Sequence, residues 1–316
     1  MKHIILGSVL FSTFAIVSCH GGNVSIGKRA EPIAPPSAQA QEPVDYDGIH
    51  NVVTFVPGVY SGSVPEGDAG FETLARMGVK TIISVDGAVP DVERARAHGL
   101  RYVHLPISYG GIEPERQREI ARAIRDLEGP FYVHCHHGKH RSAGAAASAA
   151  VLLGKLTPDE AIARMKVSGT SPSYKGLYNC VATATAATED QLRSASNAFP
   201  EVTQPSGLVD SMVAIDETME HLRAIEKAGW KVPSSHPDLV PAAEAGKLAD
   251  LLRNLQDDAQ VKTLPDDFTV MLRRDAAKAS ELEEAIVQGT ASPDQLSASL
   301  RAITQSCKEC HTKYRD

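Results

Sequence analysis

Short apolar runs alternate with amphipathic helical patterns between about residues 47 and 185 of the 316-residue chain. The apolar runs predict buried strands at residues 51–60, 79–85, 100–107 and 130–134. Apolar residues at helical spacing predict helices between and after them, at residues 71–77, 91–98, 115–127, 143–153 and 157–167. Strands that alternate with helices favour a mostly parallel sheet with helices on both faces. The pattern therefore predicts an α/β domain that binds ligands at the carboxyl ends of its strands.

The region from residue 207 to 316 has a helical pattern throughout. Apolar residues recur there at steps of three and four in separate segments, at residues 208–222, 241–258, 268–286 and 296–314. The last segment follows Ser292-Pro293-Asp294-Gln295, in which a capping Ser precedes Pro in the first turn and Gln at the third position. Amphipathic helices of this length joined by short loops favour antiparallel packing. The sequence therefore predicts an all-α four-helix bundle after the α/β domain.

Two stretches outside these regions show no periodicity. Residues 20–46 are rich in Pro, Ala, Gly, Ser and Gln, which predicts a flexible linker. Residues 186–206 are polar and predict a second linker, so the expected domains are residues 47–185 and 207–316. A hydrophobic content of 42% is sufficient for two cores, and a net charge of −7 gives no reason to expect a nucleic-acid partner.

The first 19 residues have the pattern of an export signal. Met1-Lys2-His3 is positively charged, and the apolar run from Ile4 to Val17 is too short for a comfortable membrane anchor. The run leads into Ile16-Val17-Ser18-Cys19, which resembles the bacterial lipobox and implies cleavage before Cys19 and its lipidation. A plain secretory signal with an incidental cysteine is the alternative. Both interpretations predict export, and a lipidated Cys19 would anchor the protein on the periplasmic side of a bacterial membrane.

A cysteine and an arginine flank a short loop directly after the predicted strand at residues 130–134. The run is His134-Cys135-His136-His137-Gly138-Lys139-His140-Arg141-Ser142, and a predicted helix follows it. Backbone N–H groups and the helix dipole converge at such a junction of strand, loop and helix and form an anion site. A cysteine placed there should be held as the thiolate. A thiolate beside an arginine fork suits attack on a phosphate monoester.

This run carries the Cys-x5-Arg-Ser/Thr signature and resembles the protein tyrosine and dual-specificity phosphatase superfamily. The resemblance implies that Cys135 attacks phosphorus and that water then hydrolyses the phosphocysteine. Arg141 and the N–H groups of residues 136–141 would hold the phosphate oxygens. Ser142 would hydrogen-bond the sulfur, and His134 would orient the loop. The other residues expected to bind phosphate are His136, His137, Gly138, Lys139 and His140.

The residues of this loop also indicate a positive charge around the anion site. Lys139 and the neighbouring histidines add potential positive charge, which would favour polyanions such as inositol phosphates or phosphoinositides. A solvated rim without influence on the substrate is the alternative.

Departure of the leaving group is slow without a proton donor. The phosphatase resemblance implies an Asp after the strand that precedes the catalytic one, but residues 104–113 contain no Asp. Glu113 is the nearest carboxylate there, and Asp86 follows another strand whose carboxyl end should face the pocket. Asp86 can equally cap a turn. The open choices are Asp86, Glu113 or no carboxylic acid, and the last matters less for aryl phosphates because their leaving groups are good.

Near the C-terminus, Cys307-Lys308-Glu309-Cys310-His311 is a C-x-x-C-H motif, the attachment signature of c-type haem. In this interpretation Cys307 and Cys310 bond to the haem vinyl groups, and His311 is the proximal iron ligand. Zinc binding by the two cysteines is the alternative, but no second cysteine pair exists to complete four ligands. Cys180 is left over, either as a small buried residue or as a disulfide partner of Cys135.

The sequence C-x-x-C-H-x-x-Tyr-Arg on the fourth predicted helix resembles the class II cytochromes c, the cytochrome c-prime and c-556 group. The resemblance covers about residues 205–316 and implies one covalently attached haem c. In that group the sixth iron ligand is absent or is a Met of the first helix, and Met212 and Met219 share one face here. An ordinary core position is the alternative for both. The resemblance also suggests a redox partner and a homodimer.

These features predict an exported, lipid-anchored phosphatase fused to a c-type cytochrome that transfers electrons or senses redox state or a gas. Its substrates would be phosphotyrosine, phosphoserine or other phosphate monoesters. The alternative is a catalytically weak phosphate-binding module attached to an electron-transfer or gas-sensing cytochrome. Replacement of Cys135 by Ser separates the two, because only the first has an activity to lose.

Overall fold

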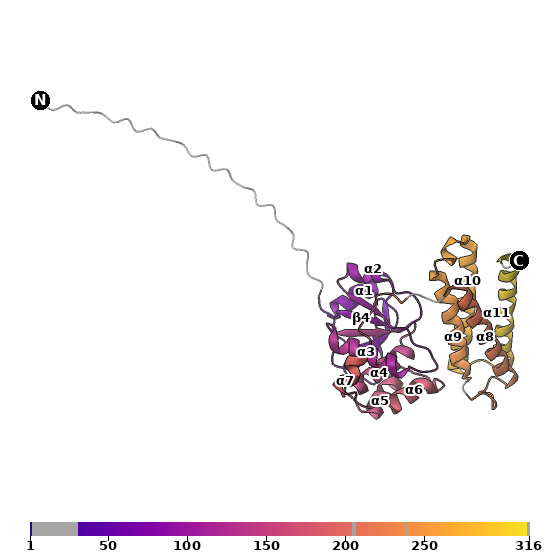
Figure 1. Cartoon of the computed structure of the whole chain (residues 1–316), viewed down its shortest axis with the longest axis horizontal. Helices are drawn as coiled ribbons and strands as arrows, with labels where there is room; N and C mark the ends of the chain where they lie inside the picture. The colour runs from indigo at the N-terminus through magenta and orange to yellow at the C-terminus, as the bar shows by residue number, and fades with distance from the viewer. Residues whose placement is uncertain (2–30, 204–206, 238, 315–316) are drawn as a thin grey trace. The chain divides into compact units, whose positions relative to one another are not determined.

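The computed structural model describes residue 1 and residues 31–203, 207–237 and 239–314. By its internal contacts the chain divides into residues 1–31 and residues 32–316, and the elements described here belong to the second unit (Figure 1). The predicted signal segment, including Cys19, lies outside the described residues. None of the helices in the described ranges is long and apolar enough to span a membrane.

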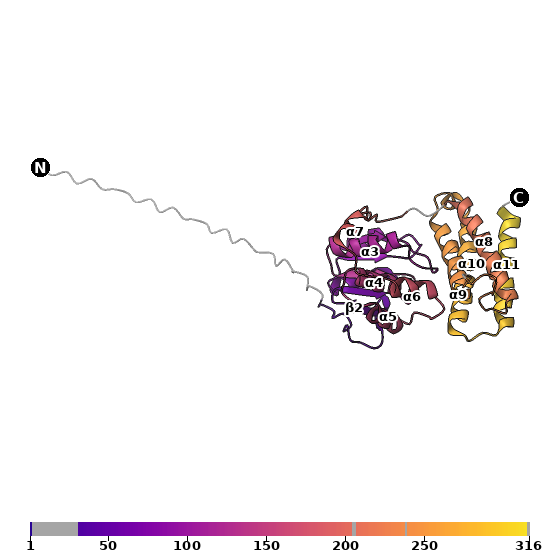
Figure 2. The same cartoon turned by 60° about the horizontal axis from the view of Figure 1, so that its bottom comes forward.

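A mixed sheet with the strand order β1-β2-β3-β6-β4-β5 lies at the centre of the first half of this unit (Figures 1 and 2). The strands are β1 (Val44–Tyr46), β2 (Ile49–Val56), β3 (Val59–Gly62), β4 (Thr81–Ser84), β5 (Arg101–His104) and β6 (Phe131–His134). The adjacent strands β3, β6, β4 and β5 are parallel, whereas β1 and β2 pair antiparallel with their neighbours. The predicted α/β sheet is therefore confirmed, and its N-terminal edge differs because tight turns permit only antiparallel pairing.

Helices cover both faces of this sheet (Figure 2). They are α1 (Gly67–Arg76), α2 (Val92–Ala97), α3 (Pro114–Asp126), α4 (Arg141–Leu152), α5 (Pro158–Val167), α6 (Lys175–Ala182) and α7 (Glu189–Ser194). Successive strand residues point to opposite faces, so Ile82 and Tyr132 pack with α1, whereas Ile83 and Val133 pack with α3 and α4. Every residue of α4 is buried, which its small Ala, Ser and Gly side chains allow. This buried helix begins at the functional loop.

Two segments that the sequence predicted as linkers pack against the α/β domain. Within residues 32–46, the carbonyl of Pro36 accepts a hydrogen bond from the hydroxyl of Thr54 at 2.5 Å. Within residues 186–203, Leu192 of α7 is buried in the core. An aperiodic backbone still offers carbonyl acceptors, so a segment without a hydrophobic pattern can dock through its backbone. The domain therefore extends past both of its predicted ends.

The second half of the unit is helical. Its elements are α8 (Leu208–Lys227), α9 (Pro241–Asn254), α10 (Asp266–Gln288), α11 (Pro293–Tyr314) and the 3₁₀ turns η1 (Leu255–Asp257) and η2 (Val261–Thr263). Helix α9 packs against α8 and α10, and α11 packs against α10 and α8, around one apolar core. Helix α11 begins where the sequence predicts, because Ser292 and Gln295 exchange two capping hydrogen bonds.

Candidate active site

The loop of residues 135–141 joins the carboxyl end of the central strand β6 to the N-terminus of α4. The helix has no side-chain cap at His140, and its first N–H groups have no intrahelical acceptors. Within the described part of the chain, none of the N–H groups of residues 136–140 donates a hydrogen bond. The 135–141 loop therefore presents a group of free donors at the positive end of a helix dipole, which suits an anion.

The carbonyl groups of the 135–141 loop are held from outside by neighbouring segments. The side-chain amide of Asn51 donates to the carbonyl of Gly138 at 3.0 Å, and the hydroxyl of Thr170 donates to the next carbonyl at 2.6 Å. Gly138 has a φ of 72°, and a Cβ there would lie 2.2 Å from the backbone of β3, so glycine is required. Because the planar peptide turns its N–H opposite to its carbonyl, these contacts orient the loop donors inward.

The structure brings the predicted nucleophile and the predicted hydroxyl together. Cys135 is 3% exposed, and its sulfur lies 3.4 Å from the hydroxyl of Ser142. His134 is buried, its Nε2 lies 2.7 Å from the hydroxyl of Tyr102, and burial lowers the pKa of His134 to about 4. The neutral imidazole thus fixes the end of β6 and brings no charge to the site.

The guanidinium of Arg141 is almost fully buried, with 1% exposure, and is surrounded by partners. Its Nη2 donates to the carboxylate of Asp86 at 3.3 Å and to the hydroxyl of Tyr109 at 3.1 Å. Its Nη1 lies 2.5 Å from Oδ2 of Asp250, and its Cζ lies 4.2 Å over the ring of Tyr109. Among the described residues Nε has no partner. The arginine is therefore fixed in place with one unpaired buried donor.

Of the two carboxylates predicted as proton donors, Asp86 does not fit that role. Burial opposes ionisation of Asp86, but the guanidinium groups of Arg141 and Arg253 hold the pKa of its carboxyl well below the usual range. Asp86 carries no proton at neutral pH, whereas a general acid must be protonated. Glu113 is exposed at the start of α3 and lines a surface hollow that adjoins the cavity beside Arg141, with Pro106, Ile107 and Ser108 lining both. The structure therefore corrects the prediction for Asp86, which positions the arginine instead, and the choice of Glu113 stays a prediction.

The histidines of the 135–141 loop do not supply the predicted positive charge. His140 is buried beside a tyrosine ring 4.3 Å away, and burial lowers its pKa to about 3. Burial also lowers the pKa of His136 to about 4 and lowers that of His137. These rings are neutral near pH 7, which leaves the exposed Lys139 and the buried Arg141 as the cations of the loop.

Asp250 on α9 is a residue of this site that the sequence pattern does not reveal. It lies 109 positions after Arg141, is 9% exposed, and pairs with both Arg141 and Arg253. Burial raises the pKa of Asp250 to about 7, an effect that Arg141 opposes and Asp86 reinforces. The signal that was available is an aspartate between Ala249 and Leu251, inside the apolar stripe of Leu248 and Leu252.

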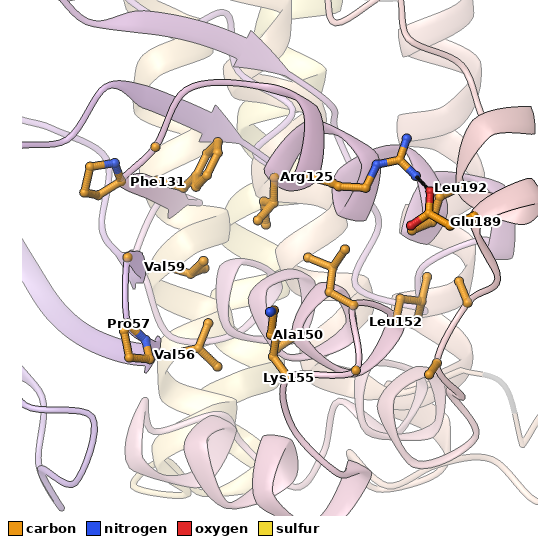
Figure 3. Close-up of a pocket in the computed structure, with 18 residues that line it drawn as sticks. Val56, Pro57, Val59, Arg125, Phe131, Ala150, Leu152, Lys155, Glu189 and Leu192 are labelled. Atoms are coloured by element: carbon orange, nitrogen blue, oxygen red, sulfur yellow. Dashed lines mark hydrogen bonds and ion pairs between the residues drawn. The ribbon is translucent and has the colours of Figure 1, made fainter.

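Cavities lie at both ends of the parallel strands of the α/β domain. A cavity of about 430 Å³ is lined by Arg141, Tyr109 and Asp250 together with the loop after β5. Another cavity, of about 830 Å³, lies at the amino ends of the parallel strands, where Val59 begins β3 and Phe131 begins β6 (Figure 3). Parallel sheets of this kind bind ligands at the carboxyl ends of their strands. Of these two cavities, the one of about 430 Å³ lies at the carboxyl ends of the strands, and Arg141 is the residue of the 135–141 loop that lines it.

The leftover cysteine is not joined to the nucleophile. Cys135 and Cys180 are both free thiols in this structure. The sulfur of Cys180 accepts a hydrogen bond from the N–H of Ile112 at 3.0 Å. Cys180 therefore helps to fix the start of the segment that leads into α3.

The C-x-x-C-H motif lies near the end of α11, with both cysteines free. Cys310 and His311 line a cavity of about 440 Å³, and Met212 of α8 lines the same cavity. Met219 is instead buried in the helical core with 4% exposure. Of the two predicted methionines, Met212 is the one that borders the motif.

The walls of this cavity fit a large apolar group. Val209 and Val213 of α8 are 70% and 66% exposed, and both line it. Phe268 and Tyr314 add two aromatic rings in edge contact, with centroids 4.9 Å apart. Neighbouring exposed apolar side chains mark a binding surface. Two free thiols, an exposed imidazole at His311 and this apolar wall are the chemical groups that a covalently attached haem requires.

No family model matches the chain. It is similar to the dual specificity protein phosphatase TpbA of Pseudomonas aeruginosa, with 26% identity over 153 residues, or 47% of this chain and 66% of that relative. The crystal structure of P. aeruginosa TpbA gives a TM-score of 0.40 at 23% identity, covering 48% of this chain and 92% of that one. A cysteine-to-serine variant of TpbA in complex with phosphotyrosine gives 0.38 at 22% identity, covering 45% and 88%. The sequence similarity supports the predicted phosphatase superfamily.

Proposed function

We propose that the chain is a cysteine-dependent phosphatase that hydrolyses phosphate monoesters through a phosphocysteine. One observation carries this proposal: the free N–H groups, the buried Arg141 and the buried sulfur of Cys135 belong to the same short loop. An anion drawn to these donors is held directly beside the nucleophile. Such placement lowers the entropic cost of attack and stabilises the charge that develops on phosphate.

The reaction has two steps. First, Sγ of Cys135 bonds to phosphorus, and the bond from phosphorus to the alcohol or phenol oxygen breaks. Arg141 and the loop N–H groups stabilise the charge on the phosphoryl oxygens. The departed alkoxide or phenoxide takes a proton from solvent. Then water attacks phosphorus and gives up a proton to solvent, the S–P bond breaks, and inorganic phosphate leaves. The departing thiolate accepts a hydrogen bond from Ser142, whose hydroxyl lies 3.4 Å from the sulfur.

Phenols suit this site better than aliphatic alcohols as leaving groups. Asp86 is ionised, and Glu113 is exposed and lines an adjoining hollow and not the cavity beside Arg141, so no protonated carboxyl is held ready beside the departing oxygen in the described residues. A phenol has a pKa of about 10, far below that of an aliphatic alcohol, so its oxygen leaves more readily without protonation. We expect aryl phosphates such as phosphotyrosine to react fastest, and phosphoserine and other alkyl monoesters more slowly.

The helical region is proposed to be a class II cytochrome c, a four-helix bundle that carries one haem c. Cys307 and Cys310 would hold the haem covalently, and His311 would ligate its iron. Met212, which borders the same cavity, is the candidate for the sixth ligand. When bound, the haem supplies one-electron redox chemistry or binding of a small gas. The apolar side chains of α8 that line the cavity would shield the group from water.

Export and lipid anchoring are proposed from the N-terminal sequence, in which Cys19 would carry the lipid. Attachment of c-type haem outside the bacterial cytoplasm agrees with export. A redox partner and a homodimer are proposed on the cytochrome resemblance.

Turnover of an aryl phosphate by wild-type and Cys135→Ser protein tests the proposed activity. The full chain is produced in a host that attaches c-type haem, and acid-quenched samples are analysed by mass spectrometry. We expect a phosphorylated peptide containing Cys135 in the wild type and no turnover in the variant. Turnover that survives in Cys135→Ser would place the activity elsewhere. Phosphate binding by a wild type without turnover would favour the phosphate-binding module.

A further inference from the structure

Helix α9 places the carboxylate of Asp250 directly on the guanidinium of Arg141. Oδ2 of Asp250 lies 2.5 Å from Nη1 of Arg141, and Nη2 donates to Oδ1 at 3.2 Å. Guanidinium groups bind carboxylates and phosphates in this same two-point manner. Because the side chains of Asp250 and Arg141 are 13% and 1% exposed, water screens the pair little. The arginine that the mechanism assigns to phosphate therefore already holds an anion.

A phosphate in the 135–141 loop would share this guanidinium with two carboxylates. Nη2 also donates to Asp86 at 3.3 Å, so both η nitrogens are engaged and Nε is the unpaired donor. A phosphate dianion beside an ionised Asp250 and Asp86 would meet like charges in a buried site, which disfavours binding. Asp86 follows β4, a strand of the same sheet as β6, from which the 135–141 loop begins. Asp250 lies on helix α9, outside this α/β domain. Asp250 is therefore the group that can withdraw.

Contacts from two helices support the carboxylate in this position. A Cβ at Gly246 of α9 would lie 2.9 Å from the ring of Tyr109, so glycine permits this close approach. On α10, Glu283 accepts a hydrogen bond from the hydroxyl of Tyr174 at 2.7 Å, and both side chains are buried. Tyr174 stacks on Tyr109 with 5.1 Å between ring centroids. The helical region thus contacts the aromatic pair beside the arginine as well as the arginine itself.

We propose that Asp250 is a built-in competitor for the phosphate group of the substrate, an inference that rests on the phosphatase function proposed above. While Asp250 is paired with Arg141, the site is closed. When α9 is displaced, the same nitrogen donors are free for phosphate. The exchange replaces one anion by another and involves no covalent step. The helical region would therefore regulate the phosphatase through the occupancy of its arginine.

Binding of inorganic phosphate to the full-length, haem-loaded protein tests this proposal by calorimetric titration. A closed state populated about nine times in ten weakens the apparent affinity about tenfold, so Asp250→Asn should bind phosphate about tenfold more tightly than wild type. Asp257→Asn is the matched control, because that carboxylate pairs with Lys262 at 3.7 Å, and its affinity should equal that of wild type. Equal or weaker binding by Asp250→Asn would overturn the proposal.

Hydrogen exchange of the wild type gives a second test that does not depend on the fold of a variant. Saturating phosphate should speed amide exchange in α9, while exchange in the buried strand β6 stays constant. Unchanged or slower exchange in α9 would contradict its displacement. Turnover is scored separately. If Asp250→Asn binds phosphate more tightly but no protein hydrolyses the aryl phosphate, Asp250 is a competitor and the proposed phosphatase activity is wrong. If hydrolysis occurs but Asp250→Asn binds phosphate as wild type does, the activity stands and the competitor is wrong.

Discussion

The 135–141 loop and the C-x-x-C-H motif of α11 both present cysteines, but the chain prepares them in different ways. Cys135 is 3% exposed, and its loop is fixed by hydrogen bonds from segments far away in the sequence, such as those of Asn51 and Thr170. Cys310 and His311 are placed by the periodicity of one helix, beside valines of α8 that are largely exposed. One site is assembled by tertiary contacts and the other by local geometry.

This difference determines what each site needs in order to function. A preorganised loop binds an anion without rearranging its own donors, so its affinity is controlled by whatever else approaches those donors. Asp250 is such a group. The haem motif needs only a formed helix and a covalent attachment step, and the attached group would itself cover the exposed apolar side chains. The two sites should therefore fail independently when each is mutated.

Serine substitutions at the two sites should give the largest effects and test this independence. Cys135→Ser should reduce aryl phosphate turnover by roughly 10⁴-fold or more, since removal of a nucleophile is among the costliest changes in an active site. Its haem absorption should be unchanged. The double variant Cys307→Ser/Cys310→Ser should lose covalent haem and retain turnover. Loss of turnover in a folded double variant would show that the sites depend on each other.

The two methionines of α8 should separate core packing from haem contact. Met219 is buried, so Met219→Ala should lower the free energy of unfolding by about 2–5 kcal/mol. Met212 is only partly buried and borders the motif, so Met212→Ala should cost less than about 1 kcal/mol. The haem absorption spectrum should change with Met212→Ala alone. Urea unfolding of both variants measures the change in stability, and their absorption spectra measure the change at the haem. A large loss of stability in Met212→Ala together with a spectral change in Met219→Ala would show that the two roles are exchanged.

Asn51 tests whether the loop depends on its distant support. It has a φ of 56°, and its side-chain amide donates to the carbonyls of Gly138 at 3.0 Å and Ser168 at 2.9 Å. Asn51→Ala loses both hydrogen bonds and strains the left-handed backbone, so it should cost about 2–3 kcal/mol of stability. Asn51→Gly removes the bonds without the strain and should cost about 1 kcal/mol less. Both variants should have reduced turnover, and full activity in either would show that the loop needs no such support.

Features encoded by neighbouring residues could be predicted from the sequence. The capping box of Thr157 and Glu160 begins α5, and Gly289 ends α10 with a φ of 63°. The loop after β6 and the C-x-x-C-H motif are equally local, so the positions of Cys135 and His311 followed from short patterns. Helix starts, turns and contiguous motifs are specified within a few residues, which is why the pattern suffices for them.

Features set by burial could not be predicted in the same way. The contact of Asp250 with Arg141 joins positions 109 residues apart, and no local pattern encodes it. The sequence suggests that the histidines of the 135–141 loop add positive charge, but burial lowers their pKa values and makes them neutral. The sequence offers Asp86 as a proton donor, but the guanidinium groups of Arg141 and Arg253 lie beside its carboxylate and keep it ionised. Charge state depends on tertiary surroundings, which the order of residues does not display.

The smallest expected effect is a pH dependence of the competition at Arg141. Burial raises the pKa of Asp250 to about 7, against the pull of Arg141 and with the help of Asp86. Arg253 on α9 and Glu283 on α10 are the other charged groups that act on it. When α9 is displaced, the carboxyl is solvated and its pKa returns to the ordinary value of about 4. A carboxyl whose pKa is raised by pairing stabilises the paired state at low pH, and that stabilisation is lost as the pH rises through 7.

The phosphate affinities of wild type and Asp250→Asn should therefore lie closest at pH 8 and differ most at pH 6. Between these values a paired carboxyl with a pKa near 7 goes from about nine tenths to about one tenth ionised, whereas a solvated carboxyl stays ionised, so the affinity ratio should grow several-fold as the pH falls. Calorimetric titrations of both proteins at each pH measure this ratio, in which the titration of phosphate itself cancels. A constant ratio would mean that the carboxylate stays ionised throughout, held by the guanidinium more strongly than burial opposes it.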